Sequence, residues 1–136
     1  MATDHSDTTQ VMIVDDEPFI RDAVVKLLAY EGIAAMAAEN GDECLDLLRK
    51  GFRGVILMDV MMPHRNGWQT IRAMADESLV AGNIISMLTS IDEPDEQMEG
   101  LQELVFDYIT KPFEPSEMVA TVRTCLGCLA RMRGEN

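Results

Sequence analysis

Residues 55–63 read VILMDVMMP, and this stretch decides the fold. Its first four residues are all apolar, which is typical of a strand buried on both faces of a parallel sheet. Asp59 follows them directly and lies inside the apolar run. Because burying an unpaired carboxylate costs free energy, Asp59 is the first candidate for a functional residue.

Four more short apolar runs occur along the chain, separated by segments whose apolar residues have helical spacing. This alternation predicts an α/β domain built on a parallel sheet. The predicted strands are residues 11–14, 33–38, 55–58, 84–88 and 108–109, and the predicted helices are 18–30, 42–50, 67–74 and 115–132. Gly100 interrupts a further segment, 93–104, where we expect a short or broken helix.

Length and composition limit the classes of protein to consider. The chain has 136 residues, 47% of them hydrophobic, which suits a single domain over residues 10–133. Residues 1–9 are polar and acidic, so we expect a disordered tail rather than a signal peptide. The net charge of −13 disfavours direct contact with nucleic acid or an anionic membrane. With no membrane-length apolar run and three cysteines, the sequence predicts a cytoplasmic protein.

Polar residues suited to metal or phosphate chemistry follow the clearest predicted strands. They are Asp15 and Asp16 after the first strand, Asp59 at the third, Thr89 at the fourth and Lys111 at the fifth. In an open doubly wound sheet, ligands bind beyond the carboxyl ends of the strands. Three carboxylates meeting there repel one another unless a cation intervenes, and Mg²⁺ prefers oxygen ligands. We therefore expect a magnesium site at this edge.

Taken singly, several of these residues have simpler explanations. Asp15 and Asp16 precede Pro18 and could cap a helix, and Thr89 could cap the next one. The C-x-x-C pair Cys125 and Cys128 falls on a helical apolar stripe, so we favour core packing over a redox or zinc site.

Four motifs, in order, resemble those of the receiver domains of two-component response regulators. They are VDDE at residues 14–17, LMDVMMP at 57–63, LTS at 88–90 and YITKPF at 108–113. The resemblance extends from about residue 11 to the C-terminus. It implies a CheY-like, flavodoxin-like fold: a doubly wound five-stranded parallel sheet of order 2-1-3-4-5 with helices on both faces.

The resemblance also implies roles for the acidic cluster. Asp59 would be the nucleophile, taking a phosphoryl group from a phosphohistidine on a sensor histidine kinase or phosphotransfer protein, or from a small phosphodonor. Asp16, Asp59 and the backbone carbonyl of Met61 would bind Mg²⁺ directly, and Asp15 would act mainly through water. Lys111 would neutralise charge on the transferring oxygens.

Other residues would carry the response. Thr89 would move to hydrogen-bond the phosphoryl group, and Tyr108 would then turn inward, changing the surface formed by residues 93–104, the fifth strand and the last helix. This surface would contact a downstream protein, and family analogy suggests a homodimer through it. The resemblance further implies a cis peptide bond between Lys111 and Pro112.

The sequence departs from the family pattern before the fifth strand, where Leu104 and Val105 replace the usual Gly-Ala pair. We expect this loop to differ, with Gly100 supplying the turn instead. Met61 and Ile91 occupy positions that tune phosphoryl lifetime in the family. Because apolar groups at both would leave the attacking water unoriented, we predict slow autodephosphorylation.

These observations favour a signalling switch rather than an enzyme: a stand-alone phosphoacceptor receiver without a DNA-binding output domain, with a fragment of a larger regulator as the other possibility. One alternative is a Mg²⁺-dependent phosphatase with a related sheet, which usually has a second aspartate two residues after its nucleophile, where this chain has Met61. Another is a pseudo-receiver that binds partners constitutively, and the complete set of site residues argues against it.

Overall fold

A computed structural model describes residues 9–90 and 100–134 of the chain. Five parallel strands form one sheet of order β2-β1-β3-β4-β5, as predicted. The strands are β1 (Val11–Val14), β2 (Ala35–Ala38), β3 (Val55–Asp59), β4 (Ile84–Ser90) and β5 (Val105–Lys111). The described helices are α1 (Pro18–Tyr30), α2 (Gly41–Arg49), α3 (Gly67–Asp76) and α4 (Pro115–Met132), with a short 3₁₀ helix at Gln102–Leu104. None of these helices is long and apolar enough to cross a membrane.

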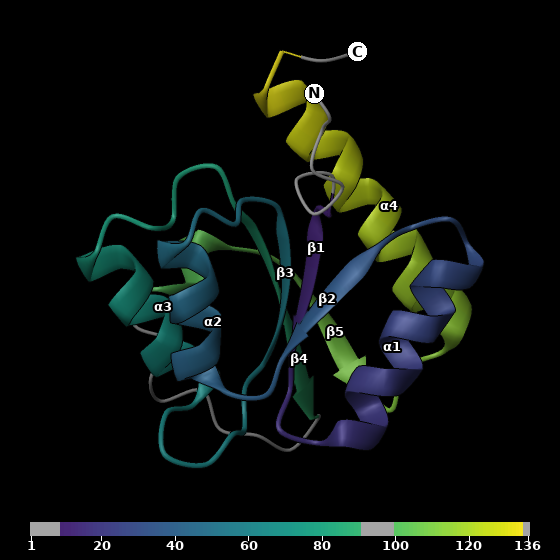
Figure 1. The fold of residues 1–136 in the computed structure, drawn as a ribbon, viewed down its shortest axis with the longest axis horizontal. Coiled ribbons are helices and arrows are strands. Elements are labelled where there is room, and N and C mark those ends of the chain that lie inside the picture. Colours follow the sequence, from purple (N-terminus) through teal and green to yellow (C-terminus); the bar gives the residue numbers. More distant parts are fainter. Residues whose placement is uncertain (1–8, 91–99, 135–136) are drawn as a thin grey trace.

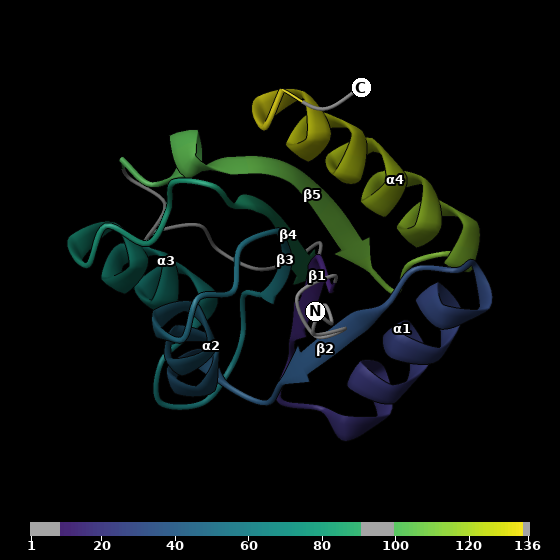
Figure 2. The ribbon, with the colours of Figure 1, turned by 45° about the horizontal axis from the view of Figure 1, so that its top comes forward.

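The helices cover both faces of the sheet, so the strands are buried from two sides. Helices α2 and α3 lie on one face and α1 and α4 on the other (Figures 1 and 2). Successive side chains of strand β1 point to opposite faces of the sheet. Met12 and Val14 pack in the core beneath α2 and α3, while Val11 and Ile13 pack in the core beneath α1 and α4. All four side chains are fully buried, which explains the continuous apolar run.

Local signals in the sequence set the helix starts. Pro18 occupies the first turn of α1, where its missing N–H costs nothing. The side chain of Asn40 caps α2 by accepting a hydrogen bond from the backbone N–H of Glu43. Asn66 and Gln69 form a reciprocal capping box at the start of α3.

Four predicted strands have different bounds in the structure. Strand β3 extends one residue further than predicted, to Asp59, and β4 two residues further, to Ser90. Strand β2 begins at Ala35, not at residue 33, because the N–H of Ile33 bonds to the carbonyl of Leu28 in the turn that ends α1. Strand β5 covers residues 105–111 rather than 108–109. It pairs with β4 throughout, with one register shift that leaves Phe106 as an extra residue.

The connection into β5 lies only partly within the described residues. Residues 91–99 fall outside them, and with them most of the helix expected at 93–104 and the position of Ile91. Gly100 has a left-handed φ of 78°, as the turn proposed for it requires. Residues 102–104 form a 3₁₀ helix rather than an α-helical turn. The tail predicted for residues 1–9 lies almost wholly outside the described residues as well.

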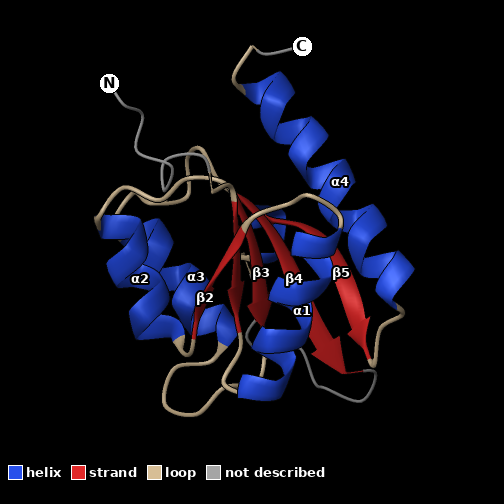
Figure 3. Ribbon diagram, turned by 45° about the vertical axis from the view of Figure 1, so that its right-hand side comes forward, coloured by secondary structure: helices blue, strands red, loops and turns tan. Residues whose placement is uncertain are grey.

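All five strands run in the same direction, so their carboxyl ends share one edge of the sheet, the lower edge in Figure 3. The register places Asp59 beside Leu88 and Ser90 beside Lys111. The ends of β3, β4 and β5 therefore bring their polar residues to the same place.

Candidate functional site

Three aspartates meet at the carboxyl edge of the sheet. Asp59 is the last residue of β3 and is 3% exposed, and Asp15 follows β1 and is fully buried. Asp16 is partly exposed. One carboxylate oxygen from each of the three residues lies within 4.8 Å of the others. The folding of β1 against β3 thus assembles the acidic cluster that the sequence predicted.

The ammonium group of Lys111, at the end of β5, lies among these carboxylates. Its Nζ donates to Asp15 Oδ2 at 2.9 Å and to Asp59 Oδ1 at 3.2 Å. Glu17 Oε1 lies farther away, at 3.9 Å. Lys111 therefore joins the ends of β1, β3 and β5 through charge-assisted hydrogen bonds.

The three aspartates differ in how their oxygens are engaged. Besides the contact with Lys111, Asp15 accepts a hydrogen bond from the backbone N–H of Glu17 on its Oδ1, at 3.0 Å. Both carboxylate oxygens of Asp15 thus have protein partners, and the residue is sealed from solvent. Asp16 is the more accessible member of the pair.

The cluster shifts the proton affinity of its members. Burial, followed by the negative charge of Asp15, raises the pKa of Asp59 to about 7, although Lys111 opposes this shift. Burial would lower the pKa of Lys111, but the hydrogen bond to Asp15 and the charges of Asp59 and Asp15 outweigh it and raise that pKa. Burial and the charge of Asp15 thus outweigh the effect of Lys111 on the pKa of Asp59.

The donor set fits a hard divalent cation. Three carboxylates that share one small space are the ligands that Mg²⁺ prefers, and the ion takes only one or two of them directly. With charges of −3 from the aspartates, +1 from Lys111 and +2 from the ion, the formal sum is zero. The raised pKa of Asp59 agrees with a site completed by a cation.

The loop after β3 holds Met61, whose side chain is 61% exposed. The N–H of Gly67 bonds to the carbonyl of Val60 at 2.8 Å and closes this loop. A Cβ at Gly67 would lie 2.5 Å from the backbone oxygen of Asp59, so only glycine allows α3 to approach so closely. Helix α3 thereby rests directly on the strand that carries Asp59.

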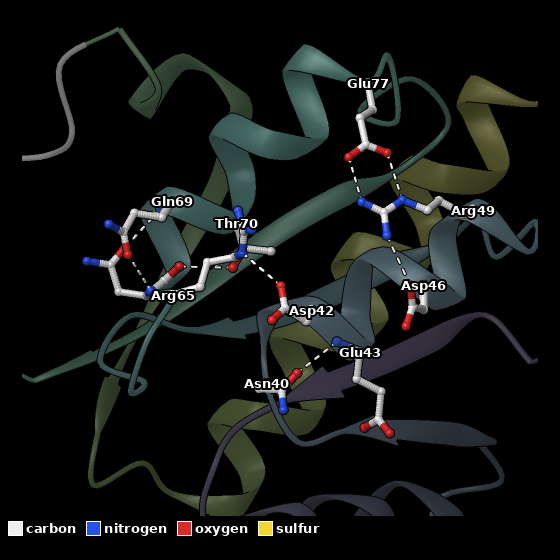
Figure 4. Close-up of polar contacts among 10 residues, drawn as sticks. Asn40, Asp42, Glu43, Asp46, Arg49, Arg65, Gln69, Thr70 and Glu77 are labelled. Atoms are coloured by element: carbon white, nitrogen blue, oxygen red, sulfur yellow. Dashed lines mark hydrogen bonds and ion pairs between the residues drawn. The ribbon is translucent and has the colours of Figure 1, made fainter.

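Polar contacts join α2 to the loop before α3 and to the residue that ends α3 (Figure 4). Arg65 Nε pairs with Asp42 Oδ1 at 3.0 Å, and the guanidinium of Arg49 forms two hydrogen bonds with Glu77. These groups are exposed, so each pair contributes little to stability. They link the two helices at the surface of the protein.

Thr89 and Tyr108 lie on the β4–β5 side of the cluster. Thr89 is partly exposed, and its Oγ1 donates to the carbonyl of Ser90 at 3.2 Å. Tyr108 is 42% exposed, so its ring lies at the surface in this structure. The Lys111–Pro112 peptide bond is cis.

Two residues near the cluster were given no role in the sequence prediction. Glu17 contributes its backbone N–H to Asp15 and its carboxylate to the surroundings of Lys111. Arg21, in the first turns of α1, donates from Nη1 to the backbone carbonyl of Asp15 at 2.8 Å. Glu17 directly follows the acidic pair in the sequence, which is its only signal. Arg21 gives none, because a long side chain six residues after Asp15 can point in many directions.

Comparison with known proteins agrees with this geometry. A family model described as the response regulator receiver domain matches residues 11–123. The phosphate regulon transcriptional regulatory protein PhoB of Escherichia coli (strain K12) is 32% identical over 126 residues, which are 93% of this chain and 55% of that protein. The probable transcriptional regulator ycf27 of Porphyra purpurea is 35% identical over 117 residues, covering 86% of this chain and 47% of the relative.

Solved structures of receiver domains also resemble this chain. A CheY-like response regulator receiver domain protein from Methanospirillum hungatei JF-1 has a TM-score of 0.87 and 47% identity, covering 90% of this chain and 97% of that one. This chain spans about half the length of the curated relatives that it matches. The family match, the strand order and the cluster around Asp59 together show that the chain belongs to the receiver-domain family of two-component response regulators.

Proposed function

We propose that Asp59 accepts a phosphoryl group from the phosphohistidine of a sensor histidine kinase or phosphotransfer protein, in a Mg²⁺-dependent reaction, and so switches a protein-interaction surface. The observation that carries the proposal is the contact of one ammonium group, that of Lys111, with both Asp15 and Asp59. A buried carboxylate beside a fixed cation, at the end of a strand, is the arrangement that a phosphoryl acceptor needs.

In the proposed reaction a carboxylate oxygen of Asp59 attacks phosphorus, and the bond from phosphorus to the imidazole nitrogen breaks with its electron pair left on that nitrogen. The imidazole then carries no phosphoryl group, and Asp59 carries an acyl phosphate. Lys111 offsets the negative charge on the transferring oxygens. The raised pKa of Asp59 means that its attacking form depends on nearby positive charge.

Asp16, Asp59 and the backbone carbonyl of Met61 would hold Mg²⁺, which supplies charge neutralisation on the phosphoryl oxygens when bound. Asp15 would act mainly through water. The burial of Asp15 and the protein partners on both of its oxygens support this division, because Asp16 is left as the accessible member of the pair.

Thr89 and Tyr108 would carry the response to the surface. Both are at least partly exposed and lie on adjacent strands, with Tyr108 beside Met87 in the register. We propose that Thr89 turns toward the phosphoryl group and Tyr108 turns inward. The downstream partner is then a protein, since the net charge of −13 opposes direct contact with nucleic acid. Stand-alone action and a homodimer through this surface stay predictions.

The test is incubation with acetyl phosphate, with and without Mg²⁺, followed by intact mass spectrometry. We expect the wild type to gain one base-labile phosphoryl group only when Mg²⁺ is present, and Asp59→Asn to gain none. Asp22→Asn, an exposed change on α1, is the matched control and should be modified like the wild type. A wild type that stays unmodified, also with a beryllofluoride analogue, would contradict the proposal and favour a pseudo-receiver.

A further inference from the structure

Arg21 reaches back from α1 to the loop that carries the acidic pair. Its backbone N–H bonds to the carbonyl of Glu17 at 3.1 Å within the first turn of the helix. Its Nη1 donates to the backbone carbonyl of Asp15 at 2.8 Å, and the side chain is partly buried. The guanidinium group is thus held against the backbone of the site, not against one of its carboxylates.

This carbonyl matters because of its place at the end of β1. The N–H of Asp15 still bonds across to the carbonyl of Ala38, at 3.2 Å, but the strand itself ends at Val14. A carbonyl just beyond the sheet ladder needs another donor, and Arg21 supplies one. Because a peptide unit is planar, the direction of the Asp15 carbonyl also fixes the N and Cα atoms of Asp16.

Asp15 is consequently anchored from three elements. Arg21 holds its carbonyl from α1, Lys111 holds its carboxylate from β5, and the N–H of Asp15 bonds to β2. Asp16 has a partly exposed side chain, which extends from the Cα atom whose position is fixed by the peptide unit that Arg21 holds.

We propose that Arg21 is a positioning residue for the metal site: by orienting the Asp15–Asp16 peptide it aims the Asp16 carboxylate at the ion and strengthens Mg²⁺ binding without touching it. The inference rests on the proposed function, since it assumes that the acidic cluster holds Mg²⁺. Partners that orient the direct ligands of a metal commonly change its affinity by about 10-fold or more.

Charge alone predicts the opposite result, which makes the inference testable. Arg21 and Mg²⁺ are both positively charged and repel each other. Removing the charge of Arg21 would therefore tighten Mg²⁺ binding if charge alone mattered. Loss of positioning would instead weaken binding. The sign of the change in affinity therefore separates the two effects.

The experiment measures the affinity for Mg²⁺ alone by isothermal titration calorimetry in the full chain. For Arg21→Met we expect binding about 10-fold weaker than in the wild type. Arg21→Lys keeps the charge and one donor, and should recover part of the loss. Lys26→Met removes a positive charge from the exposed face of the same helix and should leave the affinity nearly unchanged.

Thermal unfolding of each variant in EDTA shows whether it is folded. If Arg21→Met binds Mg²⁺ as tightly as the wild type or more tightly, the inference is overturned, even where the variant melts at a lower temperature. If Arg21→Met does not fold, Arg21→Lys decides: weaker binding than in the wild type supports the inference, and equal binding overturns it. A wild type that binds Mg²⁺ but takes no phosphoryl group would contradict the proposed function and leave the role of Arg21 in metal binding standing.

Discussion

Lys111 donates a hydrogen bond to Asp59 across the carboxyl ends of β5 and β3, at 3.2 Å. The same ammonium group pairs with the fully buried Asp15, so one cation serves two carboxylates. Lys111 reduces the electrostatic repulsion in the cluster and Asp59 adds to it. Replacing the two residues should therefore have opposite effects on the stability of the metal-free protein.

Replacing Lys111 by methionine should destabilise the protein in the absence of Mg²⁺. The change leaves Asp15 buried without the cation that now balances it, a loss that costs about 3 kcal/mol in comparable buried pairs. Thermal unfolding in EDTA should show a lower melting temperature, and added Mg²⁺ should recover part of it. Equal melting temperatures for Lys111→Met and the wild type in EDTA would show that Lys111 does not stabilise the cluster.

Asp59→Asn should stabilise the metal-free protein at neutral pH. Since the pKa of Asp59 is raised to about 7 in the folded state, ionisation of Asp59 opposes folding. Protonated Asp59 therefore contributes to the free energy of unfolding. This contribution is fully present below the pKa of Asp59 in the unfolded chain, near 4, and is lost as the pH rises through its folded pKa of about 7.

Thermal unfolding in EDTA at a series of pH values measures this effect. The melting temperature of Asp59→Asn should exceed that of the wild type most clearly at pH 8, by the equivalent of about 1–3 kcal/mol. The difference should shrink as the pH falls toward 5. A difference that is independent of pH would show that the carboxyl group of Asp59 is not the cause.

Gly67→Ala should destabilise the fold and weaken Mg²⁺ binding together. Its new Cβ would lie 2.5 Å from the backbone oxygen of Asp59, so either β3 or α3 must shift. Overpacking of this kind costs about 1–3 kcal/mol. Urea unfolding and calorimetric titration with Mg²⁺ would measure the two effects.

Gly127→Ala is the matched control for Gly67→Ala. In α4 the new Cβ would come no closer than 3.7 Å to Arg131 Nη1, which is an ordinary contact. Because alanine favours a helix interior over glycine, this variant should gain up to about 1 kcal/mol and bind Mg²⁺ as before. If both variants lose stability equally, the close approach to Asp59 is not the reason.

Met61→Asn should shorten the lifetime of the acyl phosphate. Met61 is exposed beside the acceptor, and its thioether cannot orient an attacking water as an amide can. We expect the phosphorylated wild type to persist for minutes or longer and the variant to lose phosphate faster. Following phosphate release after removal of the phosphodonor measures both rates, and a wild-type lifetime of seconds would refute slow autodephosphorylation.

The fold and the central cluster could be predicted because they depend on local patterns. The runs of β1, β3 and β4 are buried on both faces and apolar except for Ser86, and parallel strands bring Asp15, Asp59 and Lys111 to one edge. The true start of β5 could not be predicted, because it depends on pairing with Ile85 and on the extra residue Phe106. The contact of Arg21 with the Asp15 carbonyl depends on a rotamer, which no spacing in the sequence specifies.

The glycine contact between α3 and β3 has a consequence for how a signal can leave the site. On that side Gly67 leaves no space between the helix and the backbone of Asp59, and the capping box and the Arg65–Asp42 pair hold the adjoining loop. On the other side Thr89 is partly exposed and Tyr108 is 42% exposed, so neither side chain is enclosed by the core. The backbone of Asp59 thus has little room to move toward α3. We therefore expect a chemical change at Asp59 to displace β4 and β5 rather than α3.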